Sequence, residues 1–170
     1  CYSKDFNIYD NKNIELPNLP KKYILFLGSQ TYFNENLVLE KLKTLVRERL
    51  LGFKIIYRPH PWRENPWREK AIKDIEYVDE VIIDPTLKKD SDRYGSTLLP
   101  KLDLYNHIIS NASLIIGGCT SMIIESSLMR KPYLLLAHDD GNPIQSPFEY
   151  YKVSEHQNLT AILNNVSVCY

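Results

Sequence analysis

Short apolar segments alternate along this chain with segments that carry the apolar spacing of a helix, and this alternation restricts the fold more than any other feature. Five apolar runs have the length of buried strands: 23–28, 53–57, 77–84, 113–118 and 133–137. Helical spacing is found at 34–51, 100–110 and 120–129, and the last segment predicts a helix at 158–163 and a strand at 166–168. Such alternation predicts an α/β fold, a Rossmann-like parallel sheet with crossover helices on both faces.

The size and charge of the chain fit one domain, or one lobe of a larger protein. It has 170 residues, of which 44% are hydrophobic and 25% are charged. Residues 1–21 are polar, with Pro17 and Pro20 near their end, and predict a linker or lead-in before a domain at 22–170. Lys plus Arg and Asp plus Glu both number 21. This balance argues against a nucleic-acid partner.

The cysteines and apolar runs indicate the compartment. Cys1, Cys119 and Cys169 are widely spaced and form neither a CxxC pair nor a zinc-site spacing, which indicates a reducing environment. The apolar runs are strand-sized, and no secretory signal is recognisable at the N-terminus. We therefore expect a cytoplasmic protein, or one attached peripherally at the inner face of the membrane.

In open parallel sheets, ligands bind beyond the carboxyl ends of the strands. The first such loop of interest is RPHP, at 58–61, where an apolar strand stops at two prolines that flank a histidine. His60 has the chemistry to donate a hydrogen bond to a phosphate, or it serves as a structural hydrogen-bonding residue. Arg58 fits two interpretations equally well: a phosphate contact, or a pair with a carboxylate at the sheet edge. Pro61 closes the same loop.

The second loop is GGCTSMIIE, at 117–125. Gly118 ends a strand, and the hydroxyls of Thr120 and Ser121 lie in the first turn of the following helix, where free N–H groups and the helix dipole favour a phosphate. The other interpretation is an ordinary N-cap, which uses the same residue types. Glu125 lies about one turn further on, where it either reaches a sugar hydroxyl or faces solvent.

Three other features suggest chemistry but have simpler explanations. Asp90-Ser91-Asp92 matches a metal–nucleotide pattern, yet it lies in a long polar loop that we interpret as solvated. The HDDG segment at 138–141 could supply metal ligands through its carboxylates and imidazole, but its composition is also that of a turn, which is the interpretation we prefer. Cys119 lies at a helix start, which could lower its pKa, but no histidine or asparagine partner for it is identifiable.

Taken together, the two loops resemble the C-terminal, nucleotide-binding lobe of GT-B glycosyltransferases. More narrowly, the chain resembles bacterial CMP-sugar transferases for Kdo or sialic acid, and CDP-glycerol glycerophosphotransferases, of surface polysaccharide synthesis. His60-Pro61 matches the HP motif of that family, and Thr120-Ser121 matches its hydroxyl pair. The flanking segments LYNHIISNASLIIGG and ESSLMRKPYLLL also match, so the similarity covers about 23–141.

The resemblance implies a role for each matched residue. His60 would contact the donor phosphate and steady the leaving CMP, and Thr120 and Ser121 would hold the same phosphate. Gly28, Ser29 and Gln30 would line the cleft that faces a second lobe. The family implies no metal and no cofactor other than the CMP-sugar, which is the donor substrate.

The family also implies a partner lobe that 170 residues cannot contain. That lobe would bind the saccharide or glycolipid acceptor and supply the catalytic base. Other functions fit the same architecture: a UDP-sugar transferase or 2-epimerase lobe, or a non-catalytic nucleotide-binding module.

Overall fold

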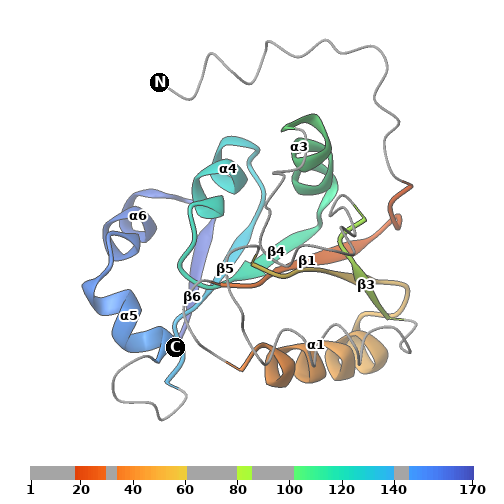
Figure 1. The fold of residues 1–170 in the computed structure, drawn as a ribbon, viewed down its shortest axis with the longest axis horizontal. Coiled ribbons are helices and arrows are strands. Elements are labelled where there is room, and N and C mark those ends of the chain that lie inside the picture. Colours follow the sequence, from red (N-terminus) through yellow and green to blue (C-terminus); the bar gives the residue numbers. More distant parts are fainter. Residues whose placement is uncertain (1–17, 30–33, 61–79, 86–101, 140–145) are drawn as a thin grey trace, which may run out of the picture.

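The computed structural model describes residues 18–29, 34–60, 80–85, 102–139 (side chains from Tyr105 onward) and 146–170. In these ranges the strands form a single six-stranded sheet in the order β3-β2-β1-β4-β5-β6 (Figure 1). Every strand pairing in it is parallel. The strands are β1 (Tyr23–Leu27), β2 (Lys54–Arg58), β3 (Val81–Ile83), β4 (Leu114–Gly117), β5 (Tyr133–Leu136) and β6 (Val166–Cys169). The predicted α/β class with a Rossmann-like parallel sheet is confirmed.

The strand order reverses between β1 and β4. The chain builds outward from β1 to β2 and β3, returns past β1 to β4, and then builds outward in the other direction to β6. The two central strands end together, because Leu27 of β1 is the register partner of Gly117 of β4. A reversal of this kind leaves a crevice at the carboxyl ends of the two strands, which is where open α/β sheets bind ligands.

Helices cover both faces of the sheet, as the alternation predicted. The helices are α1 (Glu35–Arg49), α3 (Leu102–Asn111), α4 (Met122–Leu128), α5 (Pro147–Val153) and α6 (His156–Ile162). Figure 1 shows α1 on one face of the sheet and α3 and α4 on the other. These opposite positions follow from right-handed crossovers that run in opposite directions from the centre of the sheet.

The core therefore has two layers, one on each side of the strands. The layer under α1 contains Leu39, Leu42 and Val46 of the helix with Ile24, Phe26, Ile55 and Tyr57 of the strands. The other layer contains Ile108, Ile109 and Ile123 of the helices with Leu25, Leu27, Ile56, Ile115 and Tyr133 of the strands. Because the strands are buried on both faces, their sequences are almost continuously apolar rather than alternating.

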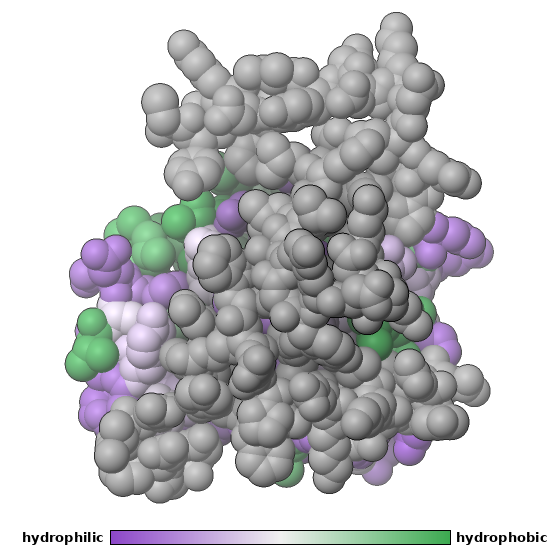
Figure 2. Space-filling model, in the orientation of Figure 1, coloured by the Kyte–Doolittle hydropathy of each residue, from purple (hydrophilic) through white to green (hydrophobic). Residues whose placement is uncertain are grey.

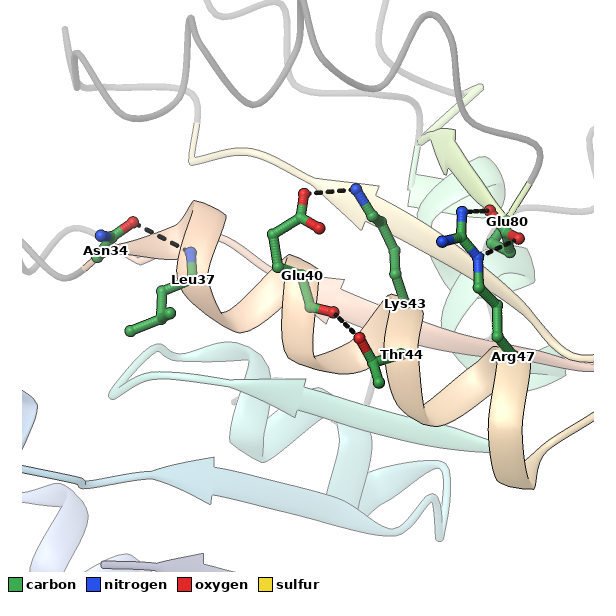
Figure 3. Close-up of polar contacts among 7 residues, drawn as sticks. All are labelled: Asn34, Leu37, Glu40, Lys43, Thr44, Arg47 and Glu80. Carbon is green, nitrogen blue, oxygen red and sulfur yellow. Dashed lines mark hydrogen bonds and ion pairs between the residues drawn. The ribbon is translucent and has the colours of Figure 1, made fainter.

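Helix α1 is held at both ends by polar contacts (Figure 3). The Asn34 side-chain oxygen accepts a hydrogen bond from the backbone N–H of Leu37 at 3.1 Å, which caps the first turn. Near the other end, Arg47 donates two hydrogen bonds to the Glu80 carboxylate, at 2.7 and 3.0 Å. Glu80 directly precedes β3, so this pair links the last turns of α1 to the start of that strand.

The sequence prediction missed α5 and placed other boundaries differently. Ser146 accepts a hydrogen bond from the backbone N–H of Glu149 at 3.1 Å, and Pro147 occupies the first turn. This cap starts a helix that we did not predict from the sequence. Within the expected lead-in at 1–21, Leu19 packs against the core. The sequence also predicts a short helix after Pro66, and that segment lies outside the described residues.

The surface of the described ranges mixes polar and apolar side chains. Figure 2 shows apolar residues beside polar ones over the side where α4 and α6 lie. The exposed apolar side chains of these helices and of the end of α5 are Ile124, Leu128, Val153 and Ile162. Among the helices in the described ranges, none combines the length and the hydropathy needed to cross a membrane.

Candidate functional site

The parallel topology brings the ends of the central strands to one edge of the sheet. Gly28 and Ser29 follow β1, and Pro59 and His60 follow β2. On the other side of the switch point, residues 118–121 follow β4. Both loops that the sequence singled out are thus on the same edge, and they flank the end of β1.

The end of β1 packs directly against the histidine loop. The backbone N–H of Gly28 donates to the carbonyl of Arg58 at 2.8 Å. A Cβ atom on Gly28 would lie 2.7 Å from the backbone nitrogen of His60 and 3.0 Å from the Cα of Pro59. Only glycine permits this approach without displacing backbone. Gly28 and Ser29, predicted to line a cleft, are both buried at this junction.

Arg58 takes the second of its two predicted roles, a pair with a carboxylate at the sheet edge. Its guanidinium forms a buried ion pair with Asp84, which follows β3, and lies 4.9 Å from the ring centroid of Tyr105 on α3. Arg58 shares a face with Ile56, because side chains alternate along a strand, so it enters the layer under α3. Burial raises the pKa of the Tyr105 phenol above its ordinary range, and the nearby Glu125 raises it further.

The β4 side of the edge is held by a buried tyrosine. The Tyr133 hydroxyl donates to the carbonyl of Gly118 at 2.9 Å. A Cβ on Gly117 would lie 2.6 Å from that hydroxyl oxygen and 3.0 Å from the Cβ of Leu27. Because Gly117 has no side chain, the Tyr133 phenol from β5 fits against the end of β4. Complete burial raises the pKa of Tyr133, so the hydroxyl stays protonated and remains a donor.

Thr120 and Ser121 differ in their environments. The Thr120 hydroxyl oxygen accepts a hydrogen bond from the backbone N–H of Met122 at 3.0 Å, which is the capping role. Ser121 is exposed, and its hydroxyl makes no capping hydrogen bond. The capping interpretation thus describes Thr120, while Ser121 presents its hydroxyl at the surface of the edge.

Cys119 does not have the activated thiol that a helix start suggested. It is buried, and the Ser154 hydroxyl lies 3.8 Å from its sulfur. Desolvation raises the pKa of the thiol to about 11. The expected effect of a helix start is outweighed because the thiol lies in the core rather than in front of the helix.

Glu125 faces inward from α4 and is half buried. Its Oε2 atom is enclosed and has no hydrogen-bond partner among the described residues. Desolvation raises the pKa of this carboxyl group above its ordinary value. A carboxylate with an unused acceptor beside the loop at 118–121 is able to accept hydrogen bonds from a ligand hydroxyl.

Several predicted residues lie where the structure gives no account of them. Gln30, Pro61, Asp90 and Asp92 are all outside the described residues. Within the described ranges, no three His, Cys, Asp or Glu side chains are grouped closely enough to hold a metal ion.

The structure also adds residues that the sequence did not suggest. Glu35, in the first turn of α1, is buried, and its carboxylate accepts hydrogen bonds from the Tyr57 hydroxyl and from the backbone N–H of Ser29 at 3.3 Å. A first-turn glutamate after an asparagine usually indicates favourable interaction with the helix dipole, so this inward orientation is not visible in the sequence pattern.

Comparison with known proteins supports the fold. No protein-family model matches the chain, and no curated protein matches it in sequence. In fold, it resembles E. coli heptosyltransferase WaaC with ADP-2-deoxy-2-fluoro heptose, at 17% identity and a TM-score of 0.52. It also resembles S. aureus MnaA with UDP (17%, 0.51) and Methanocaldococcus jannaschii UDP-GlcNAc 2-epimerase with UDP-GlcNAc and UDP (13%, 0.51).

The match to WaaC covers 91% of this chain and 38% of WaaC. The matches to MnaA and to the M. jannaschii epimerase cover 88% and 87% of this chain, and 32% and 34% of those two proteins. The chain thus spans about a third of the length of the structures it resembles. The expectation that it folds as one Rossmann-like lobe of the GT-B type is confirmed.

Proposed function

We propose that this chain is the nucleotide-sugar-binding lobe of a glycosyltransferase-like enzyme. The observation that carries the proposal is the convergence of the β1, β2 and β4 ends at one edge, across the reversal of strand order. His60 lies on one side of the end of β1, and residues 118–121 lie on the other. A phosphate group beyond the end of β1 would lie between His60 and residues 118–121.

Each half of this edge would contribute a different contact. His60 would donate a hydrogen bond to the donor phosphate, and its charge would rise as the phosphate approaches. The exposed Ser121 hydroxyl would contact the same phosphate from the β4 side. Glu125, with its unused buried acceptor, would accept hydrogen bonds from hydroxyls of the nucleoside sugar. Arg58 is buried and its charge is compensated by Asp84, so we assign it to holding the end of β2 rather than to the phosphate.

The identity of the nucleotide separates two candidate functions. The HP motif and the hydroxyl pair favour a CMP-activated sugar, of the Kdo or sialic acid type. The solved structures that share the fold include two described with UDP, which favours a UDP-sugar transferase or 2-epimerase lobe. We place the CMP-sugar first because its two motifs are present in order on the matching elements.

Catalysis would need groups beyond this chain. We assign no carboxylate of this edge as the base that takes a proton from the acceptor hydroxyl, because Asp84 is paired with Arg58 and Glu125 is assigned to the nucleoside sugar. A second lobe would supply that base together with the saccharide or glycolipid acceptor, and it would exclude water from the donor. The 170-residue chain should therefore bind the donor nucleotide without transferring the sugar.

The test compares His60→Ala with His107→Ala by titration calorimetry. A lost charge-assisted hydrogen bond is worth roughly 1.5–3 kcal/mol, so His60→Ala should weaken nucleotide binding by roughly ten- to a hundredfold. His107 lies on α3, and its ring contacts Asn111 at 3.2 Å near the amino end of β4, so His107→Ala should leave the affinity unchanged. Equal affinities in the two variants would contradict the proposed role of His60.

The nucleotide is assigned with CMP, UMP and UDP at millimolar concentration, read as a rise in melting temperature. Stabilisation by CMP above UMP supports the CMP-sugar function, and stabilisation by UDP alone supports the UDP-sugar function. If none of the three stabilises the wild-type chain, the proposed function is wrong. Sugar transfer by the purified chain alone would contradict the need for a second lobe.

A further inference from the structure

Glu35 occupies an unusual position for a residue in the first turn of a helix. Its side chain is 1% exposed, whereas neighbouring residues of the same turn are partly or fully exposed. One carboxylate oxygen accepts from the backbone N–H of Ser29 at 3.3 Å, and the other accepts from the Tyr57 hydroxyl. The carboxylate thus joins the start of α1 to Ser29, which follows β1, and to Tyr57 near the end of β2.

Capping of the helix does not explain this arrangement. Asn34 already caps α1 through its side-chain oxygen, at 3.1 Å from the Leu37 nitrogen. A glutamate at this position would interact favourably with the helix dipole while facing solvent. Burial of a carboxylate is costly unless hydrogen bonds compensate for it. The inward orientation of Glu35 is therefore explained by what it contacts in the sheet.

Those contacts lie beside His60. The position that a Cβ would take on Gly28 is 3.0 Å from the Glu35 Oε2 atom and 2.7 Å from the backbone nitrogen of His60. The carboxylate and the histidine backbone therefore both pack against the same glycine. Tyr57, which donates to Glu35, is two residues before Pro59 in the chain. Movement of the carboxylate would break its hydrogen bonds to Ser29, which follows β1, and to Tyr57, which lies in the strand that leads to His60.

We propose that Glu35 is a positioning residue, which sets the placement of Gly28 and Ser29 relative to Pro59 and His60. It acts through Ser29 and Tyr57 and does not itself touch the ligand. This inference rests on the proposed function, because the placement of His60 matters only if His60 contacts a nucleotide phosphate. Glu35 belongs to α1, so a buried residue outside both segments would set where His60 lies relative to Ser29.

Substitutions at Glu35 separate hydrogen bonding from charge. Glu35→Gln keeps the shape: the amide oxygen can accept from Ser29, and the amide nitrogen can donate to the Tyr57 oxygen. Glu35→Ala leaves the Ser29 N–H and the Tyr57 hydroxyl without this partner. Val46→Ala is a matched control, because Val46 is buried in the same helix, 3% exposed, about three turns away.

The first measurement is nucleotide affinity by calorimetry, with whichever of CMP and UDP stabilises the wild-type chain. Glu35→Ala should weaken binding by about tenfold or more, because the loops lose their relative placement. Glu35→Gln should restore affinity to within about threefold of wild type, and Val46→Ala should retain affinity despite its lower stability. Equal losses in Glu35→Ala and Val46→Ala would show a purely structural role and overturn the proposal.

The second measurement is backbone amide hydrogen exchange by NMR, which needs no ligand. In Glu35→Ala, the amides of Ser29 and His60 should exchange about tenfold faster relative to the β4 and β5 amides. Unchanged relative exchange at both positions would overturn the positioning role. If the wild-type chain binds no nucleotide, the proposed function fails, and the exchange measurement still decides whether Glu35 sets the placement of the two loops.

Discussion

The two halves of the candidate site are built by different means. On the β1–β2 side, the end of the strand, the histidine loop and the start of α1 are joined through a glycine and a buried carboxylate. On the β4–α4 side, Thr120 caps its own helix at 3.0 Å, and one tyrosine supports Gly118 from below. The first half thus depends on contacts among three elements, whereas the second combines a local cap with one contact from β5.

This difference indicates how each half responds to change. A site built from local hydrogen bonds should lose stability in small steps, because each residue supports only its neighbours. In a site built from contacts among three elements, one substitution should cause a large loss of stability, because one displaced atom moves several segments. The following predictions test that contrast from the largest expected effect to the smallest.

Gly28→Ala should have the largest effect. The new methyl group would meet the backbone of His60 and Pro59, which has little room to move, and we expect a loss of about 3 kcal/mol of stability in urea unfolding. Gly52→Ala is the comparison, because Gly52 has φ +85° but nothing within 4 Å of a Cβ. That variant should lose about 1 kcal/mol from backbone strain alone. Equal losses in the two variants would contradict the packing role of Gly28.

Gly117→Ala should cost less, about 2 kcal/mol, because its main obstacle is a side-chain hydroxyl. Tyr133→Phe removes that oxygen and one hydrogen bond, at a cost of about 1 kcal/mol. In the double variant the new methyl group occupies the space left by the Tyr133 oxygen. The double variant should therefore lose at least about 1 kcal/mol less stability than the sum of the losses in the two single variants. Strict additivity in the double-mutant cycle would show that the contact between these two residues does not limit packing.

Thr120→Ala and Ser121→Ala should differ although the residues are adjacent. Loss of the cap in Thr120→Ala should lower the free energy of unfolding by about 1 kcal/mol. Ser121→Ala removes an exposed hydroxyl and should change stability by less than about 0.5 kcal/mol. If Ser121 contacts phosphate as proposed, its variant should weaken nucleotide binding without this loss of stability. No change in either quantity would remove Ser121 from the site.

Glu125→Gln should give the smallest effect, visible as a pH dependence. Burial raises the pKa of Glu125 in the folded state above its ordinary value of 4.5, so the folded state holds its proton to higher pH than the unfolded state does. Wild type therefore loses stability as the pH rises from the ordinary pKa through the raised one, and the glutamine variant does not. The melting temperature of Glu125→Gln minus that of wild type should increase over this interval. A difference that is constant with pH would contradict the burial effect.

Much of the fold followed from sequence because the strands are buried on both faces. Short apolar runs such as Ile55–Tyr57 and Leu114–Ile116 are typical of strands inside a sheet, and the helical spacing of Leu39, Leu42 and Val46 matches their burial. α5 was missed because Ser146 and Pro147 are common in turns, and only the hydrogen bond to the Glu149 nitrogen distinguishes a cap from a loop.

The site was less predictable than the fold. Loop position follows from strand order, so Arg58, His60, Thr120 and Ser121 were placed on the correct edge without coordinates. The partners of those residues come from distant segments, as Asp84 does for Arg58. No local pattern shows that Glu35 turns inward or that Cys119 is buried, because both depend on which helix covers which face.

The reversal of strand order has a consequence for how the chain folds. Ile24 pairs with Ile55 in β2 and with Leu114 in β4, which lie 31 and 90 positions further along. Closing the longer loop costs about 1 kcal/mol more in chain entropy, so we expect β1–β2 and β4–β5 to associate before the central strands join. During synthesis, β1 must wait for most of the domain to emerge from the ribosome. The edge that would receive a nucleotide forms only when β1 and β4 have paired, so the ligand can bind only after the two halves of the sheet have joined.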